Sequence, residues 1–493
     1  MIGATCLAMR NVMGSPKRLW IHAVGLTVVF SISACATAPS SASATAVASA
    51  RAEMAPAFSD TTQFQTSLQP SIAPDTLDRW WTRFADPLID RWVDEALKRN
   101  SDIGIAHARL LRARALFERA KAETSPTLQL DTLASRQRSS QEESLTGSAR
   151  TISTLTTQGS LSWEIDLFDR LGAASRAAGE RVEASQADQM GVRLIVSAEV
   201  VRQTLAARSV QARLKVAQSA VASAQSLAEI AQVRTDAGLA MPADSLRARA
   251  QLQEVQADEV ALRSSMTSIL AALGMLLHGT PSELADQLAA APGTKPLNLT
   301  VGAVLPVELL SRRPDVLQAE ALMRAAGADV ESVNAAIWPT LKVDATAGLA
   351  GGTFSALTGP GAAVGMLAGG ISWNFFDGGR LAADRGSAAA VQQEAVAKYR
   401  QVVHRAYIEA DAALADVAQG NRSARAISLA LQSQLEASAV FETQYRAGLS
   451  DASSWLEAQR SEQRLRDRSE QFAFALASSW VTVFKSLGGV NSP

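Results

Sequence analysis

Residues 155–172 read LTTQGSLSWEIDLFDRLG and contain the pattern that decides the fold. From Leu155 to Leu167, every second position is apolar or small, and the positions between them are polar or acidic. A period of two predicts a β-strand with one apolar and one polar face. Arg170 then opens a long segment without proline that is rich in alanine, so the strand is expected to lead directly into a helix.

This strand is the second arm of a predicted hairpin over residues 126–167. Leu128 and Leu130 alternate with polar neighbours before it, and the polar segment 136–150 joins the two arms. A second hairpin is predicted over 339–376, with a turn at 358–361. Each strand approaches the roughly 9–11 residues that a tilted strand needs to cross a bilayer. Trp163 and Trp373 fall at matching strand ends and are predicted membrane-interface aromatics, although a plain core role is the alternative.

The two hairpins belong to an internal duplication. Residues that recur at an offset of 210 include Trp163, Arg170, Leu171, Gly238 and Leu246, matched by Trp373, Arg380, Leu381, Gly448 and Leu456. Upstream the offset becomes 213, where Pro126, Leu128 and Asp131 are matched by Pro339, Leu341 and Asp344. The repeated unit of about 200 residues is too long for a solenoid repeat. Each half is therefore expected to be one large module, packed on the other by pseudo-symmetry.

Long helices are predicted to occupy most of each half. The segments 172–234 and 380–445 lack proline and would extend about 95 Å at 1.5 Å per residue. Turns centred on Gly238 and Gly448 lead into returning helices over 243–277 and 453–486. The expected organisation assigns 76–125 and 168–277 to the first helical hairpin, 278–313 to a linker, 314–338 and 377–486 to the second-half helices, and 487–493 to a tail. The stretch 345–376 lacks charge, but its eight glycines and Pro360 exclude a membrane helix.

Four strands that face lipid would leave two open edges, which hydrocarbon does not tolerate. Two copies would form eight strands, a barrel filled by its own side chains, whereas three copies would form twelve strands around an aqueous lumen. The sequence therefore predicts a homotrimer with one shared barrel.

The N-terminus has the layout of a secretory signal over residues 1–34. Arg10, Lys17 and Arg18 precede an uncharged stretch that ends in small residues. The ending Ile32-Ser33-Ala34-Cys35 resembles a bacterial lipobox, in which Cys35 becomes the lipidated first residue; an ordinary signal with a chance cysteine is the alternative. Residues 35–75 would then form a lipid-anchored periplasmic segment. In lipoproteins of this type, a residue other than Asp after the cysteine, here Ala36, favours the outer membrane.

Composition argues against nucleic acid and against catalysis. The 493 residues carry 47 basic and 48 acidic side chains, so no general field would hold a polyanion. The four histidines are scattered and form no metal-ligand spacing or nucleophile motif; they are His22, His107, His278 and His404. We expect no enzyme activity and no cofactor other than the covalent lipid on Cys35.

Several separated motifs resemble the TolC-like outer-membrane factors of tripartite efflux pumps, in particular their lipoprotein branch. They are Trp80-Trp81-Thr82-Arg83-Phe84, Asp86-Pro87, Arg312-Arg313-Pro314-Asp315, Phe375-Phe376-Asp377-Gly378-Gly379-Arg380 and Phe484-Lys485 with Leu487-Gly488-Gly489. The resemblance covers nearly the whole chain beyond the signal and implies a mainly α fold with membrane β: a trimeric 12-stranded outer-membrane β-barrel continued by a long periplasmic α-helical barrel. It also implies a periplasmic adaptor protein and an inner-membrane transporter, usually of the resistance-nodulation-division class, as partners, with a passive role in multidrug resistance.

The second helical turn, Tyr445 to Leu449, resembles the tip motif of that family, in which acidic residues six and nine places beyond the glycine narrow the pore. Here those places hold Ser454 and Glu457, so one of the two acidic rings is in doubt; Glu457 would form a ring of three carboxylates. Asp244 and Arg247 occupy the same places in the first repeat. One hypothesis joins Asp244, Arg247, Tyr445 and Glu457 in a network that holds the tip shut; the alternative is solvated residues at helix starts.

Two other functions stay open from the sequence. A lipid-anchored periplasmic coiled-coil adaptor or scaffold would also have long helical hairpins, but it would not need paired strands in both halves. A type I secretion channel would share the whole architecture with an efflux channel.

Overall fold

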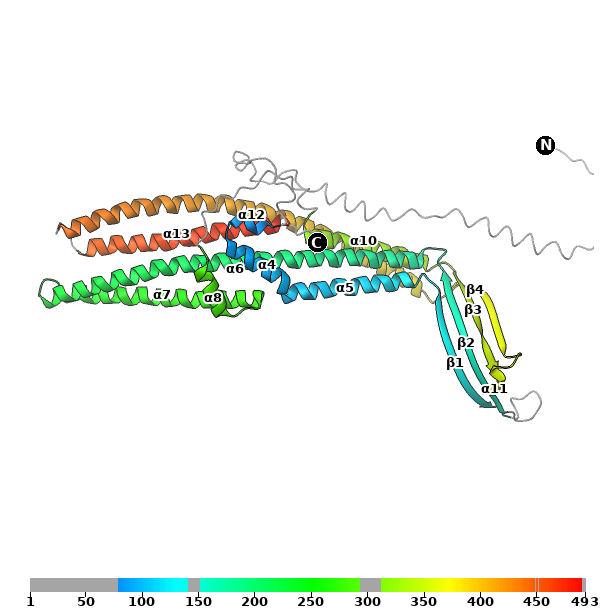
Figure 1. The fold of residues 1–493 in the computed structure, drawn as a ribbon. Coiled ribbons are helices and arrows are strands. Elements are labelled where there is room, and N and C mark those ends of the chain that lie inside the picture. Colours follow the sequence, from blue (N-terminus) through cyan, green and yellow to red (C-terminus); the bar gives the residue numbers. More distant parts are fainter. Residues whose placement is uncertain (1–78, 141–150, 293–311, 448, 451, 490–493) are drawn as a thin grey trace, which may run out of the picture.

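The computed structural model describes residues 79–140, 151–292, 312–447, 449–450 and 452–489. The predicted signal, Cys35 and the segment 35–75 lie outside the described residues, as do most of the linker and the centre of the second turn, Gly448. Described helices precede and follow each pair of strands, and the sheet projects from one end of the long helical body (Figure 1).

The sheet contains four antiparallel strands in the order β1-β2-β3-β4. Their bounds are β1 Thr127–Arg138, β2 Thr151–Ile165, β3 Thr340–Gly351 and β4 Ala363–Ser372. The two predicted hairpins are thus confirmed, and β2 pairs with β3 to join them. A short helix that the sequence did not predict, α11 (Phe354–Leu357), precedes the predicted turn of the second hairpin. β1 and β4 are the edges of the sheet, and neither pairs with a further strand among the described residues.

The register separates the side chains of the sheet into two faces. Leu128 lies opposite Leu161, and Trp163 lies opposite Val343, so these residues share one apolar face. The next positions along the strands form the polar face, with the pairs Asp131↔Gln158, Ser162↔Asp344 and Glu164↔Lys342. Alternation along a strand is what produces this division.

Two helices of 67 residues, α6 (Arg170–Asp236) and α12 (Arg380–Arg446), form the long axis of the molecule. At 1.5 Å per residue each extends about 100 Å, close to the predicted length. Each returns through a second helix, α7 (Pro242–Leu277) and α13 (Ala452–Ser486) respectively. Proline at the first position of α7 fits this start because that residue needs no backbone N–H donor.

Shorter helices complete the body: α4 (Pro87–Arg99), α5 (Ser101–Ala122), α8 (Pro281–Ala290) and α10 (Pro314–Ala335). α6 contacts α5, α7, α10 and α13, and α10 also contacts α12. The two halves are therefore joined side by side along α6 and α10 as well as through the sheet. By length and composition, one described helix, α7, could cross a membrane.

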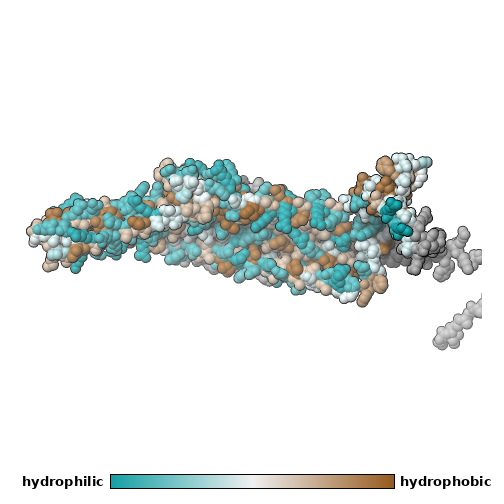
Figure 2. Space-filling view, turned by 90° about the horizontal axis from the view of Figure 1, so that it is seen from below, coloured by the Kyte–Doolittle hydropathy of each residue, from teal (hydrophilic) through white to brown (hydrophobic). Residues whose placement is uncertain are grey.

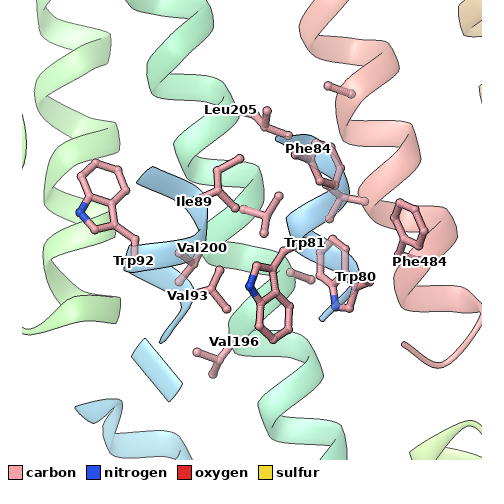
Figure 3. Close-up of a cluster of buried hydrophobic side chains, with 14 of the residues drawn as sticks. Trp80, Trp81, Phe84, Ile89, Trp92, Val93, Val196, Val200, Leu205 and Phe484 are labelled. Atoms are coloured by element: carbon pink, nitrogen blue, oxygen red, sulfur yellow. The ribbon is translucent and has the colours of Figure 1, made fainter. Parts of the chain in front are cut away.

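A cluster of buried aromatic side chains lies in the middle of the helical body. Trp80, Trp81 and Phe84 come from the 3₁₀ helix η2 (Trp80–Phe84) and are each 1% exposed. Figure 3 shows them between α6 and Phe484 of α13. The rings of Trp80 and Phe484 stack with their centroids 5.5 Å apart. Full burial of a side chain as large as Phe484 is worth about 1.5–3 kcal/mol, so this cluster ties the start of the described chain to its last helix.

Candidate functional site

The two tryptophans predicted at the membrane interface have the same hydrogen bond. The indole Nε1 of Trp163 donates to the backbone oxygen of Thr124 at 3.0 Å. The indole Nε1 of Trp373 donates to the backbone oxygen of Ile337, also at 3.0 Å. Both rings are exposed, by 37% and 58%. Each indole thus ties the end of a hairpin to the segment that leads into it, and presents an apolar ring to its surroundings.

The strand-to-helix junctions are also equivalent. Asp169, just before α6, has φ +61°, and Gly379, 210 residues later, has φ +91°. Asp166 accepts hydrogen bonds from two amides at the start of α6, and Asp377 accepts two at the start of α12. The amide of Leu381 and further backbone donors favour the ionised carboxylate and lower the pKa of Asp377. Both long helices therefore start on a left-handed residue with a carboxylate nearby.

The polar face of the sheet carries two equivalent aspartates, Asp131 and Asp344. The offset of 213 that relates them also relates β1 to β3, so both lie five residues beyond the proline that precedes their strand. Asp131 accepts hydrogen bonds from Gln129 at 2.8 Å and from Ser160 at 3.1 Å. Because the opposite face is apolar, a sheet that crosses a membrane would turn these carboxylates away from lipid.

The turn between α6 and α7 forms the first tip. Gly238 has φ +71°, and the amide of Leu239 donates to the backbone oxygen of Arg234 at 2.8 Å, which closes the end of α6. Asp244 lies in the first turn of α7, 3.9 Å from Arg247. Both side chains are more than half exposed, so this ion pair adds little stability.

The second tip repeats that closure, because the amide of Leu449 donates to the backbone oxygen of Gln444 at 2.9 Å. Tyr445 stacks on Trp455 of α13 with ring centroids 5.0 Å apart. Glu457 lies 3.7 Å from Arg464, and both side chains are largely exposed. Ser454 lies in the first turn of α13 and is partly buried.

The structure thus brings Asp244 and Arg247 together, whereas Tyr445 and Glu457 contact residues of α13. Sequence reasoning missed Trp455 as the partner of Tyr445. The available signal was two aromatic side chains ten positions apart on either side of a predicted turn.

Hydrophobic side chains also lie along the outer surface of the helices, scattered among hydrophilic ones (Figure 2). Exposed examples are Ile105, Leu111, Leu116, Ile195, Leu322 and Val391.

Among the residues that the structure describes, no group of three or more His, Cys, Asp or Glu could hold a metal ion.

A four-stranded sheet continued by long helical hairpins defines one subunit of a TolC-like channel. The chain belongs to the outer membrane efflux protein family, whose model matches residues 92–279 and 305–489. The expected fold class and family are thereby confirmed. The family consists of efflux channels and not of enzymes.

Two relatives and one solved structure illustrate the match. The pyoverdine export outer membrane protein OpmQ of Pseudomonas putida is 27% identical over 432 residues, which cover 87% of this chain and 91% of OpmQ. The solvent efflux pump outer membrane protein SrpC of Pseudomonas putida is 29% identical over 417 residues, covering 82% of this chain and 86% of SrpC. The structure of the outer-membrane channel OprN superposes with a TM-score of 0.81 at 26% identity, covering 90% of this chain and 98% of OprN. The protein is the outer-membrane component of an efflux system.

Proposed function

We propose that this chain is one subunit of a lipid-anchored homotrimeric channel that passively conducts small molecules out of the cell. An adaptor protein in the periplasm and an inner-membrane transporter of the resistance-nodulation-division class would deliver them. The observation that carries the proposal is the four-stranded sheet with one apolar face and two unpaired edges. In hydrocarbon, β1 must pair with β4 of a neighbouring copy, and three copies close twelve strands around a lumen.

Efflux is favoured over type I secretion by the named cargo of the relatives. OpmQ and SrpC are named for pyoverdine export and solvent efflux, and both cargoes are small molecules. A chain that shares their length and fold fits the same class of cargo. The channel itself needs no catalytic group, because the transporter would supply the energy.

At the periplasmic end, we infer that the two tips narrow the pore. Glu457 would contribute a ring of three carboxylates by threefold symmetry, with Ser454 in place of a second acidic ring. The exposure of Glu457 supports this role, because its carboxylate can reach a lumen. A contact between Asp244 or Arg247 and the second tip would belong to the closed trimer.

Cys35 would carry the acyl chains and anchor the first residue of the mature chain in the outer membrane. The anchor holds the protein at the membrane without spanning it. Mass spectrometry of the intact protein from membranes would detect the acyl chains, and Cys35→Ser would lose that added mass. An unmodified Cys35 in the wild-type protein would contradict the anchor.

The principal test is the conductance of the purified full-length protein in planar bilayers, measured together with its native mass in detergent. We expect trimers that conduct and prefer cations. Glu457→Gln should raise conductance and weaken the cation preference, whereas Glu394→Gln, an exposed carboxylate far from the tip on α12, should change neither. A monomeric mass would overturn the shared barrel. Identical conductance and cation preference in Glu457→Gln and wild type would overturn the ring.

A further inference from the structure

Two arginines lie on the mainly apolar face of the sheet. Side chains alternate along a strand, so on β1 the residues Leu128, Leu130, Arg136 and Arg138 share one side. The cross-strand pairing of Leu128 with Leu161 identifies this side as the apolar face. The arginines therefore point toward the membrane and not toward the lumen.

Both arginines lie just beyond the apolar part of that face. The pair Ala134↔Leu155 ends the apolar part, and the next rows on this face are Arg136↔Ser153 and Arg138↔Thr151. From Trp163 to Ser153 the strand advances ten residues, about 33 Å along its axis and about 25 Å across a membrane at the usual tilt. That height equals the apolar band of an outer-membrane barrel. The arginines thus lie at the interface opposite the one marked by Trp163.

Neither guanidinium has an acidic partner among the residues that the structure describes. Arg136 and Arg138 are both exposed, and the carboxylate of Asp131 on the same strand lies on the other face. A lipid-facing arginine is costly at the bilayer midplane but costs little at the interface. Two exposed guanidinium groups at the interface would provide a site for lipid phosphate, which the guanidinium fork matches with two parallel hydrogen bonds.

We propose that Arg136 and Arg138 bind the phosphate groups of the anionic glycolipid that forms the outer leaflet, through its phosphorylated glucosamine headgroup. The end of β1 that carries these residues points away from the helical body (Figure 1). Because the helical body would lie in the periplasm, this end would lie on the outer side of the membrane. The inference rests on the proposed placement of the sheet across the outer membrane. Successive residues on one side of a strand are about 6.6 Å apart, so the two side chains can engage one headgroup together.

The test titrates purified full-length protein in detergent with diphosphorylated lipid A and counts bound lipid by native mass spectrometry. The variant is R136Q/R138Q. The control is R112Q/R114Q, which removes the same two charges from exposed positions on α5, outside the sheet. One basic side chain near an anionic surface contributes roughly a fivefold change in binding. We therefore expect about 25-fold weaker lipid A binding in R136Q/R138Q and wild-type binding in the control.

Lipid A without phosphate and phosphatidylglycerol distinguish the headgroup chemistry. We expect the wild-type protein to bind both less tightly than diphosphorylated lipid A. Equal binding of dephosphorylated lipid A would overturn the role of phosphate, equal binding of phosphatidylglycerol would overturn the glycolipid as the occupant, and wild-type binding by R136Q/R138Q would overturn the site. Conductance and native mass are measured on the same samples: conducting trimers without this lipid preference refute only the lipid site, whereas failure to form trimers refutes the proposed function.

Discussion

The ion pair between Arg208 and Asp86 is buried, with the side chains 7% and 0% exposed. The guanidinium Nε lies 3.1 Å from the carboxylate, and Nη2 donates to the backbone oxygen of Pro292 at 2.7 Å. Asp86 also accepts from the amide of Leu88 at the start of α4. One arginine of α6 thus fixes two distant chain segments to the middle of the helical body.

Removal of one partner from this pair should be costly. We expect Asp86→Asn to lower the free energy of unfolding by about 3–5 kcal/mol, because the Arg208 charge would remain buried without a counterion. Asp94→Asn is the matched control: Asp94 pairs with Arg79 at 2.9 Å, but both are exposed, so its cost should stay below about 1 kcal/mol. Thermal unfolding in detergent measures both, and equal midpoints for the two variants would contradict the argument.

Glu470 on α13 is expected to make stability depend on pH. Burial, with the nearby Asp467 carboxylate, raises the pKa of Glu470 above its usual range. The folded protein therefore binds this proton more tightly than the unfolded chain. The resulting stability is fully present below the unfolded pKa of about 4.3 and is lost as the pH rises through the raised folded pKa.

Glu470→Gln should remove that dependence, so we expect the variant to be more stable than wild type at pH 7.5 and not at pH 4. Glu394 is the control of opposite sign, because a hydrogen bond from Lys398 lowers its pKa. Its stabilising contribution exists above the unfolded pKa and is lost as the pH falls through the folded one, so Glu394→Gln should be the less stable protein at pH 7.5. Thermal midpoints across this pH range test both signs.

At the scale of elements, the residue before α12 has a left-handed backbone conformation that favours glycine, whereas the interior of the helix has no such requirement. Gly379 has φ +91°, whereas Gly386 lies within the helix, and a Cβ at either position would meet nothing within 4 Å. Gly379→Ala should therefore destabilise by about 1–2 kcal/mol through backbone strain alone. Gly386→Ala should stabilise by about 1 kcal/mol, because alanine is the better helix former. A gain in thermal midpoint for both variants would show that the junction tolerates a side chain.

Most elements could be predicted from local pattern, because alternation and missing prolines act over neighbouring residues. The expected helix 172–234 lies within α6, which is only two residues longer at each end, and the expected copy 380–445 ends one residue before α12 does. Contacts between distant segments could not be predicted in this way. The Trp80 stack on Phe484 and the Arg208 pair join residues that no local period relates. The Tyr445 stack on Trp455 is different, because the two residues are only ten positions apart on either side of a predicted turn.

At the scale of the whole molecule, the duplication makes the chain two nearly equivalent halves. The Trp163 and Trp373 hydrogen bonds and the paired turn closures show that the equivalence extends to single contacts. Three copies of such a chain would place equivalent side chains six times around one axis. A single charged position in the ancestral unit therefore becomes a ring.

Asp131 and Asp344 are the charged pair for which this matters most, because both lie on the polar face at the same distance from their helices. In the proposed trimer they would form six carboxylates in the barrel lumen and concentrate cations there. We expect D131N/D344N to lower the cation preference by roughly twofold or more, seen as a reversal potential closer to zero under a KCl gradient. Asp94→Asn, which removes an exposed carboxylate of α4, should leave it unchanged. Glu457 lies at the opposite end of the molecule from the sheet, so the effects of Glu457→Gln and D131N/D344N on the reversal potential should add when the variants are combined. If D131N/D344N alone conducts like wild type, the polar face does not line the pore.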